Sequence, residues 1–129
     1  MPQARRHMSR DLLSVEPSLT LTEVAKRMVD KDVGAVLVME GERLVGILTE
    51  RDVLRAVARG IDDSTAVADY MTRNPETLEP DESTEHAAVL MIHGGFRHLP
   101  VTDGDEVVGM LSIRDLMRVV LEDAVPRGA

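Results

Sequence analysis

The eight residues Val45–Asp52, VGILTERD, return in altered form as Val108–Asp115, VGMLSIRD, at an offset of 63 positions. Each copy begins as an apolar run, which is typical of a β-strand, and ends in a Thr or Ser followed three residues later by Asp, which is typical of a helix start. The match extends without gaps from Met8–Arg59 to Met71–Glu122. The chain is therefore a tandem duplication of a unit of about 50 residues.

Both copies predict the element order β-α-β-β-α. Thr20 and Glu23 predict a capping box at the first helix, whereas Ser83 predicts a cap without the box because His86 stands where Glu would be. Gly41 and Gly104 predict hairpin turns. The expected elements are a strand at 13–15, helices at 21–31, 50–58 and 113–123, and hairpin strands at 35–39, 44–48, 99–102 and 107–111.

The fold class that follows is α/β (α+β), because small sheets with apolar strands need helices or another sheet to cover them. We expect the two β-α-β-β-α motifs to pack with pseudo-two-fold symmetry and to cover each other's sheets, since one unit is too small to close a core alone. The expected boundaries are 8–60 for motif 1, 61–70 for a linker with a short helical turn at 65–70, 71–123 for motif 2, and flexible termini at 1–7 and 124–129.

Composition excludes several classes of function. The 129 residues include no Cys, which excludes disulfides, thiolate catalysis and cysteine-ligated metals. The net charge is −8, distributed as −1 over residues 1–63 and −7 over 64–129, and there are only one Phe, one Tyr and no Trp, so general nucleic-acid binding is not expected. No apolar run approaches a membrane span and no secretory signal is evident, so we expect a cytoplasmic protein without a membrane partner.

Thr49 with Asp52, and Ser112 with Asp115, allow two interpretations. The simpler one is helix capping by a hydroxyl, with an acid in the first turn. The functional one uses the same geometry, because a carboxylate at a helix start can accept both hydroxyls of a ribose while the free amides take an anionic group.

Arg97 and His98 precede a predicted strand, and the equivalent positions Gly34 and Ala35 bring no charge. The residues alone indicate an ordinary surface Arg and a half-buried His at a strand start. A phosphate-binding role, for which Arg offers a fork of donors and His adds a charge that depends on pH, is implied only by the family resemblance given below. His86 and His93 lie two helical turns apart, too far for one ion, so no metal site is predicted. No motif places a nucleophile, a base and an orienting group together, so no catalysis is predicted.

The repeats resemble a pair of CBS motifs, which are named after cystathionine β-synthase, of the stand-alone bacterial or archaeal type. The resemblance depends on the strand–Pro–Thr/Ser–helix opening, on the two copies of VG-x-L-(T/S)-x-R-D, and on Phe96–Val101 at the second hairpin. It implies a Bateman module whose clefts bind adenosine-containing ligands. Carried onto this sequence, the nucleotide site comprises Thr49, Asp52, Thr77, Arg97, His98, Leu99 and Pro100, and a second, weaker site comprises Ser14, Gly34, Ala35, Val36, Ser112 and Asp115.

The expected function is a non-enzymatic sensor that binds AMP, ADP or ATP, with S-adenosylmethionine or NAD in second place, requires no cofactor, and signals to an unknown effector protein. The alternatives are a structural dimerisation or interaction module with vacant clefts, and an accessory subunit of an enzyme. A homodimer is expected because the last helix of each repeat has a wide apolar face. The residues of these faces are Val53, Leu54, Val57, Leu116, Met117, Val120 and Leu121.

Overall fold

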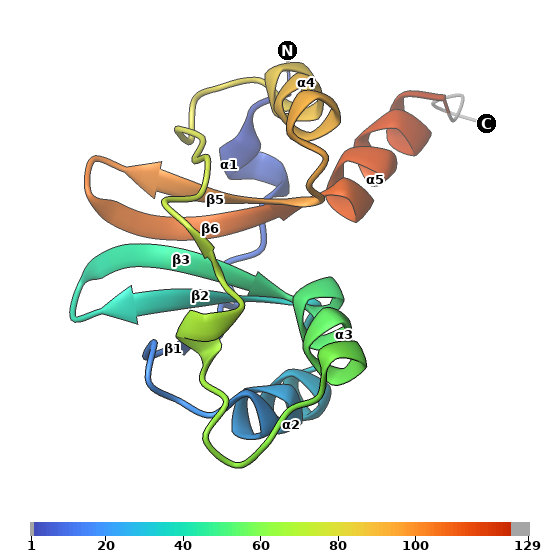
Figure 1. The fold of residues 1–129 in the computed structure, drawn as a ribbon. Helices are drawn as coiled ribbons and strands as arrows, with labels where there is room; N and C mark the ends of the chain where they lie inside the picture. The colour runs from blue at the N-terminus through green and yellow to red at the C-terminus, as the bar shows by residue number, and fades with distance from the viewer. Residues whose placement is uncertain (1, 125–129) are drawn as a thin grey trace. The chain divides into compact units, whose positions relative to one another are not determined.

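The computed structural model describes residues 2–124, which form two units (Figure 1). The first unit is residues 12–75 and carries the first repeat; the second combines residues 2–11 with 76–124 and carries the second repeat. Each unit has its own sheet and its own hydrophobic core. The fold is mixed α/β, as the sequence predicted.

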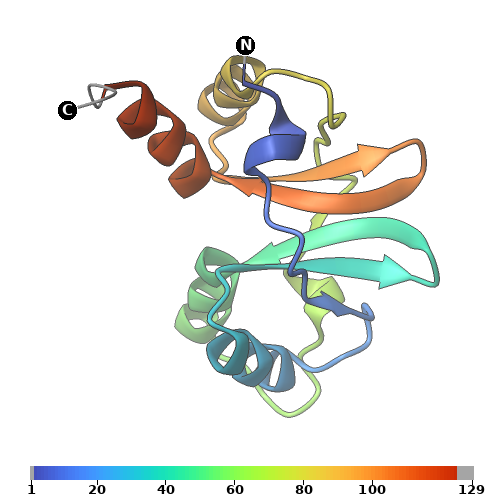
Figure 2. The same ribbon diagram turned by 180° about the vertical axis from the view of Figure 1, so that it is seen from behind.

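The first unit is built on a four-stranded sheet in the order β1-β2-β3-β4, in which β1 runs parallel to β2 and the other neighbours are antiparallel. Helices α2 and α3 lie side by side in both views (Figures 1 and 2). Gly41 makes the β2–β3 turn with a φ of +60°, a conformation that favours glycine. The elements are β1 (Ser14–Val15), α2 (Leu21–Lys31), β2 (Ala35–Glu40), β3 (Arg43–Thr49), α3 (Glu50–Arg59), the 3-10 helix η1 (Val67–Asp69) and β4 (Thr72–Arg73).

The second unit repeats this plan, except that its edge strands are reduced to isolated bridges. Its hairpin β5–β6 is flanked by single bridges, Leu78 parallel to Val101 on one side and Ser9 antiparallel to Met110 on the other. The hairpins of the two units even shift register at the same place, after Val38 and after Val101. The elements are α1 (Ala4–His7), α4 (Thr84–Gly94), β5 (His98–Asp103), β6 (Glu106–Ser112) and α5 (Ile113–Ala124).

Each unit is stabilised by its own cluster of buried side chains. Each lies between the hairpin and the helices of its own repeat, because alternate strand residues and one helix face are apolar. In the first unit the cluster comprises Val15, Leu21, Val24, Met28, Val36, Val38, Val45, Leu48, Ala56 and Val67. In the second it comprises Ala4, Leu78, Ala87, Met91, Leu99, Val101, Leu111 and Leu116.

The helix starts follow the predicted caps, with one correction. The hydroxyl of Thr20 accepts a hydrogen bond from the amide of Glu23 (3.3 Å), and that of Ser83 accepts one from the amide of His86 (3.1 Å). The predicted capping box at Thr20 was wrong in its second half, because the carboxylate of Glu23 turns instead to Arg27 at 3.4 Å. A cation one turn away on the helix surface competes with the backbone for that carboxylate.

The segment that precedes each repeat packs on the unit of the other repeat. In the first unit, residues 65–68 pair with residues 17–21; in the second, residues 2–5 pair with residues 80–84 in the same pattern. Three backbone hydrogen bonds of the first unit have counterparts in the second, all between 2.9 and 3.0 Å. In the first unit the amide-to-carbonyl bonds are Leu21 to Thr65, Val67 to Leu19 and Ala68 to Pro17. Their counterparts in the second unit, in the same order, are Thr84 to Pro2, Ala4 to Glu82 and Arg5 to Pro80.

This exchange changes the expectation for the N-terminus. Residues 1–7 were predicted as a flexible terminus, whereas Ala4–His7 forms α1, with Ala4 fully buried and Arg5 paired with Asp81. Residues 2–5 pair with the second unit in the same way that residues 65–68, which belong to the predicted linker, pair with the first unit. The predicted flexible C-terminus, 124–129, lies outside the described residues apart from Ala124, which ends α5.

Both segments pass close to a glycine of the adjacent strand. A Cβ built on Gly46 would lie 2.6 Å from the sulfur of Met71 and 2.9 Å from the carbonyl oxygen of Thr72. A Cβ on Gly109 would lie 2.4 Å from the sulfur of Met8. Glycine therefore permits the close approach in both units.

Candidate functional site

The start of α3 is a complete capping box that buries a carboxylate. Asp52 is 6% exposed, and its Oδ2 accepts hydrogen bonds from the amide (2.9 Å) and the hydroxyl (3.1 Å) of Thr49. The Thr49 hydroxyl in turn accepts a bond from the Asp52 amide (3.4 Å). The other oxygen, Oδ1, lies 3.5 Å from Arg55 Nη1, at the limit of a hydrogen bond. The cap thus uses one carboxylate oxygen and leaves the other with a weak contact.

The start of α5 has the same geometry. Asp115 Oδ2 accepts bonds from the amide (2.8 Å) and hydroxyl (2.9 Å) of Ser112, and Oδ1 lies 3.4 Å from Arg118 Nη1. The side chain of Asp115 is 12% exposed. The capping interpretation is therefore confirmed in both repeats. In each repeat the capping box orients a charged acceptor at the helix start.

A strand start lies beside each of these helix starts. In the first unit Ala35 pairs across the hairpin with Thr49, and the Gly34 carbonyl accepts a bond from the Glu50 amide (3.0 Å). In the second unit His98 pairs with Ser112, and the Arg97 carbonyl accepts a bond from the Ile113 amide (2.9 Å). Within one unit, then, the exposed Arg97 and the half-buried His98 lie next to an acidic cap, while the equivalent place in the other unit has no cation.

The predicted site residues are divided between the units. Each predicted site takes residues from both units, so these groupings stay predictions. In the second unit Thr77 is exposed, while Leu99 and Pro100 are buried and could offer a ligand only backbone atoms; in the first, Val36 is likewise buried. The Pro100 carbonyl already accepts a bond from the Leu78 amide (3.0 Å).

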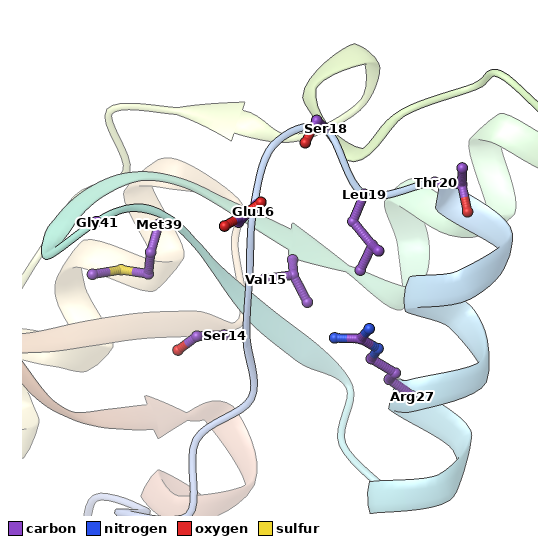
Figure 3. Close-up of a pocket in the computed structure, with 9 residues that line it drawn as sticks. All are labelled: Ser14, Val15, Glu16, Ser18, Leu19, Thr20, Arg27, Met39 and Gly41. Atoms are coloured by element: carbon purple, nitrogen blue, oxygen red, sulfur yellow. The ribbon is translucent and has the colours of Figure 1, made fainter.

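A hollow of about 580 Å³ opens in the first unit along β1, one of the two edge strands of the sheet (Figure 3). The guanidinium of Arg27 points from α2 toward Val15 and Leu19, and Glu16 lies on the strand side (Figure 3). A volume of this size suits a small molecule. The lining residues are Ser14, Val15, Glu16, Ser18, Leu19, Thr20, Arg27, Met39 and Gly41.

Sequence reasoning missed Arg27 and Glu16 in this hollow. Ser14, which belongs to the predicted second site, lines the same hollow. The repeat offered one signal, because Leu90 occupies the position equivalent to Arg27. A cation that only one repeat keeps, on a helix beside the edge strand, marks a difference between the two.

Two further expectations concern metals and membranes. Within residues 2–124, no three His, Asp or Glu side chains are grouped as metal ligands. In the same part of the chain, no helix combines the length and the apolar character that a bilayer span requires.

The chain matches known proteins along both repeats. The family model for the CBS domain matches residues 4–59 and again 67–122. A 17.7 kDa protein of Acidianus ambivalens is 37% identical over 110 residues, which cover 84% of this chain and 66% of that protein. The CBS domain-containing protein YhcV of Bacillus subtilis is 35% identical over 117 residues, which cover 90% and 84%. Another curated relative, MJ1225 of Methanocaldococcus jannaschii, is spanned over only 43% of its length.

The fold also matches solved structures. The CBS domain pair of protein MJ0100, in complex with 5′-methylthioadenosine and S-adenosyl-L-methionine, has a TM-score of 0.87 and 25% identity, with 95% of this chain and 98% of that chain covered. The duplicated capping boxes, the duplicated hairpins and the two family matches agree repeat by repeat. The chain belongs to the CBS-domain family, as a tandem pair of CBS domains.

Proposed function

We propose that this CBS pair is a non-catalytic sensor that binds an adenosine-containing ligand between its two domains and signals to a partner protein. The observation that carries the proposal is the carboxylate of Asp52, which the capping box orients through Oδ2 while Oδ1 retains only a 3.5 Å contact. A ribose diol needs such an acceptor, and charge-assisted bonds to it are strong. The buried position of Asp52 makes the acceptor rigid.

The ligand proposed first is AMP, ADP or ATP. Its ribose would bind Asp52 and Thr49, and its phosphates would meet Arg97 and His98, with Thr77 and the backbone of Leu99 and Pro100 completing the site. The family resemblance supports this grouping. So does the distribution of cations, because Gly34 and Ala35 replace Arg97 and His98 in the other repeat. On this proposal the protein acts in the cytoplasm through a change in the population of two conformations.

Calorimetry with matched variants tests the ribose assignment. Asp52→Asn removes the charge but keeps the Thr49 cap, and Asp115→Asn makes the same change in the other repeat. We expect Asp52→Asn to weaken AMP about 10- to 100-fold, the loss of one charge-assisted interaction, and Asp115→Asn to leave that affinity unchanged. An unchanged affinity in Asp52→Asn would refute the assignment.

Arg97→Ala separates phosphate binding from the shaping of the site. We expect it to weaken AMP by a similar factor and adenosine little, because adenosine has no phosphate to lose. Equal losses for AMP and adenosine would mean that Arg97 acts by shape. No binding of any adenosine compound to the unmodified protein would favour the alternatives, a structural interaction module with vacant clefts or an accessory subunit of an enzyme.

A second ligand class is favoured by the hollow beside β1. Arg27 and Glu16 line it with the apolar side chains of Val15, Leu19 and Met39, and Ser14 belongs to the proposed second site. A cation and an anion in one hollow match a ligand that carries a carboxylate and an ammonium, as S-adenosyl compounds do. The MJ0100 complex, which contains S-adenosyl-L-methionine and 5′-methylthioadenosine, supports this choice.

These two compounds differ in the amino-acid part, which 5′-methylthioadenosine lacks. We expect Arg27→Gln to weaken S-adenosylmethionine about 10- to 100-fold and to leave 5′-methylthioadenosine unchanged. Lys26→Gln is the matched control, because Lys26 is the exposed cation next to Arg27 and does not line the hollow. Equal losses of affinity for both compounds would contradict the proposal that Arg27 binds the carboxylate of S-adenosylmethionine.

We also propose that the protein is a homodimer through its helices. Leu54 and Val57 of α3 and Met117, Val120 and Leu121 of α5 are exposed, as the sequence predicted. Two predicted residues of these faces are exceptions: Leu116 is buried in the core of the second unit, and Val53 is half-buried against the core of the first. Large apolar side chains exposed together on a helix are typical of a contact with another chain.

A further inference from the structure

The segments that precede the two repeats are attached to the edge of a sheet by very few backbone pairs. In the first unit the attachment is β4, whose two residues pair with Gly46 and Ile47. In the second unit it is a single bridge between Ser9 and Met110, with bonds of 2.8 and 2.9 Å in the two directions. Such short attachments open locally at low cost in free energy, so the side chains that pack beside them contribute much of what holds the segments in place.

One methionine lies at the same place in each attachment. Met71 follows the 3-10 helix η1 and Met8 follows the helical turn α1, and the amide of each donates a bond of 2.9 Å back to that turn. Both methionines are half-buried and pack against the core of their unit. Each sulfur lies over a strand glycine, where a Cβ would come within 2.6 Å of it at Gly46 and 2.4 Å at Gly109. The two thioethers therefore anchor equivalent segments.

The surroundings of each sulfur suit a thioether better than a polar group. Apart from the methionine and the glycine's own neighbours in the chain, the atom nearest to the Cβ position of Gly46 is the carbonyl oxygen of Thr72, at 2.9 Å. At Gly109 it is the carbonyl oxygen of Ser9, at 3.1 Å. Carbonyl oxygens accept hydrogen bonds and donate none. A sulfur that carried an oxygen would bring a second acceptor to this contact, and an acceptor that loses its donors is unfavourable.

We propose that Met8 and Met71 are paired oxidation sites, at which hydrogen peroxide converts the thioether to a sulfoxide and releases the segment that each methionine anchors. The sulfur attacks one peroxide oxygen, the O–O bond breaks as the S–O bond forms, and the leaving hydroxide takes the remaining proton and becomes water. The sulfur loses two electrons, which the peroxide gains. The chain contains no Cys, so peroxide meets no thiol in it that would react first.

The modification is reversible, because methionine sulfoxide reductases remove the oxygen as water while thiols are oxidised to a disulfide. This chain contains no thiol, so its reduction requires such an enzyme as a partner. Neither methionine belongs to the residues proposed to bind adenosine-containing ligands. Sensitivity to peroxide and ligand binding can therefore be tested separately.

Peroxide treatment followed by peptide mass spectrometry and hydrogen exchange tests the proposal. We expect sulfoxide at Met8 and Met71 and a rise of about tenfold in the amide exchange of residues 2–11 and 65–73, as for the loss of hydrogen-bond donors by one acceptor. Methionine sulfoxide reductases with dithiothreitol should reverse both changes. Molecules oxidised only at Met8 should show the rise in residues 2–11, and those oxidised only at Met71 in residues 65–73, a comparison that needs no variant.

Matched variants separate these two sites from oxidation elsewhere in the chain. The double variant Met8→Leu/Met71→Leu keeps apolar side chains of similar volume, cannot form either sulfoxide, and should retain slow exchange after peroxide. Met117→Leu is the control, because Met117 on α5 is 60% exposed and its loss should leave the response unchanged.

Three results would overturn the proposal. The first is protein in which Met117 is fully oxidised while Met8 and Met71 stay reduced. The second is sulfoxide at both sites without a rise in the exchange of the two segments. The third is an equal rise in the double leucine variant, which would assign the response to other methionines.

Discussion

The first and second units differ in chemistry far more than in backbone. Their hairpins shift register at equivalent residues, their acidic helix caps have the same hydrogen bonds, and the segments that precede them pair in the same way. Their charges do not match, because Arg27 becomes Leu90, Arg59 becomes Glu122, and Gly34 becomes Arg97. The comparison teaches that turns, caps and apolar positions preserved the fold after duplication, while exposed positions were free to give each unit its own binding properties.

The largest expected effect comes from removing one equivalent leucine in each core. Leu48 and Leu111 are both fully buried, in separate clusters. Leu48→Ala and Leu111→Ala should each lower the free energy of unfolding of their own unit by about 2–5 kcal/mol, through lost burial and a cavity. Hydrogen exchange should rise mainly in residues 12–75 for the first variant and in residues 2–11 and 76–124 for the second.

If either substitution raised exchange equally in both units, the two cores would behave as a single cooperative structure. That outcome would contradict the description of the units as separate cores. Leu54→Ala, an exposed leucine of the first unit, is the matched control and should leave exchange within both cores nearly unchanged.

A smaller effect is expected at the two strand glycines. A Cβ on Gly46 would meet the Met71 sulfur at 2.6 Å and a backbone oxygen at 2.9 Å, whereas on Gly109 the nearest backbone oxygen is 3.1 Å away. Gly46→Ala should therefore cost about 1–3 kcal/mol as overpacking, and Gly109→Ala less. Denaturant unfolding measures both.

The reason for this order is that a methionine side chain can move, whereas a paired backbone moves only with its strand. A second pair of variants isolates the methionines: Met71→Ala should partly relieve Gly46→Ala, and Met8→Ala should relieve Gly109→Ala more fully. A larger loss for Gly109→Ala than for Gly46→Ala would contradict the assignment of the backbone contact as the main cost.

Most of the fold could be predicted from the sequence because its signals are local and occur twice. Helix α2 and both hairpins follow from periodicity, caps and turn glycines, which act over a few residues. α1 could not be predicted, because one turn of helix has no periodic pattern and Ala4 finds its partners near residue 82. For the same reason, the sequence could not predict that the segment preceding each repeat packs on the unit of the other repeat. That placement depends on backbone pairing between residues far apart in the chain.

The candidate site divides in the same way. The caps at Asp52 and Asp115 were predicted because a hydroxyl and an acid three residues apart have few other arrangements at a helix start. Arg27 was missed because its direction toward the hollow depends on the position of β1 relative to α2. The burial of Leu99 and Pro100 agrees with the predicted apolar strand at 99–102, whereas their place in the nucleotide site stays a prediction.

The smallest expected effect concerns Asp62, a carboxylate in the segment that follows α3. It accepts hydrogen bonds from the hydroxyl (2.7 Å) and the amide (2.8 Å) of Ser64, and these bonds, with a weaker one from Thr65, hold the pKa of Asp62 below its ordinary value. A carboxyl whose pKa is lower in the folded state stabilises that state above its unfolded pKa of about 3.9. The contribution is lost as the pH falls through the folded pKa.

Asp62→Asn should therefore slightly lower the unfolding temperature at pH 7, and the difference from the unmodified protein should vanish in acid below the folded pKa. Carboxyl carbon NMR of the unmodified protein should show Asp62 titrating below the usual range, and Ser64→Ala should move that titration upward. Asp63→Asn, at the neighbouring exposed carboxyl, is the control. An Asp62 titration that Ser64→Ala leaves unchanged would mean that the turn does not hold the charge in solution.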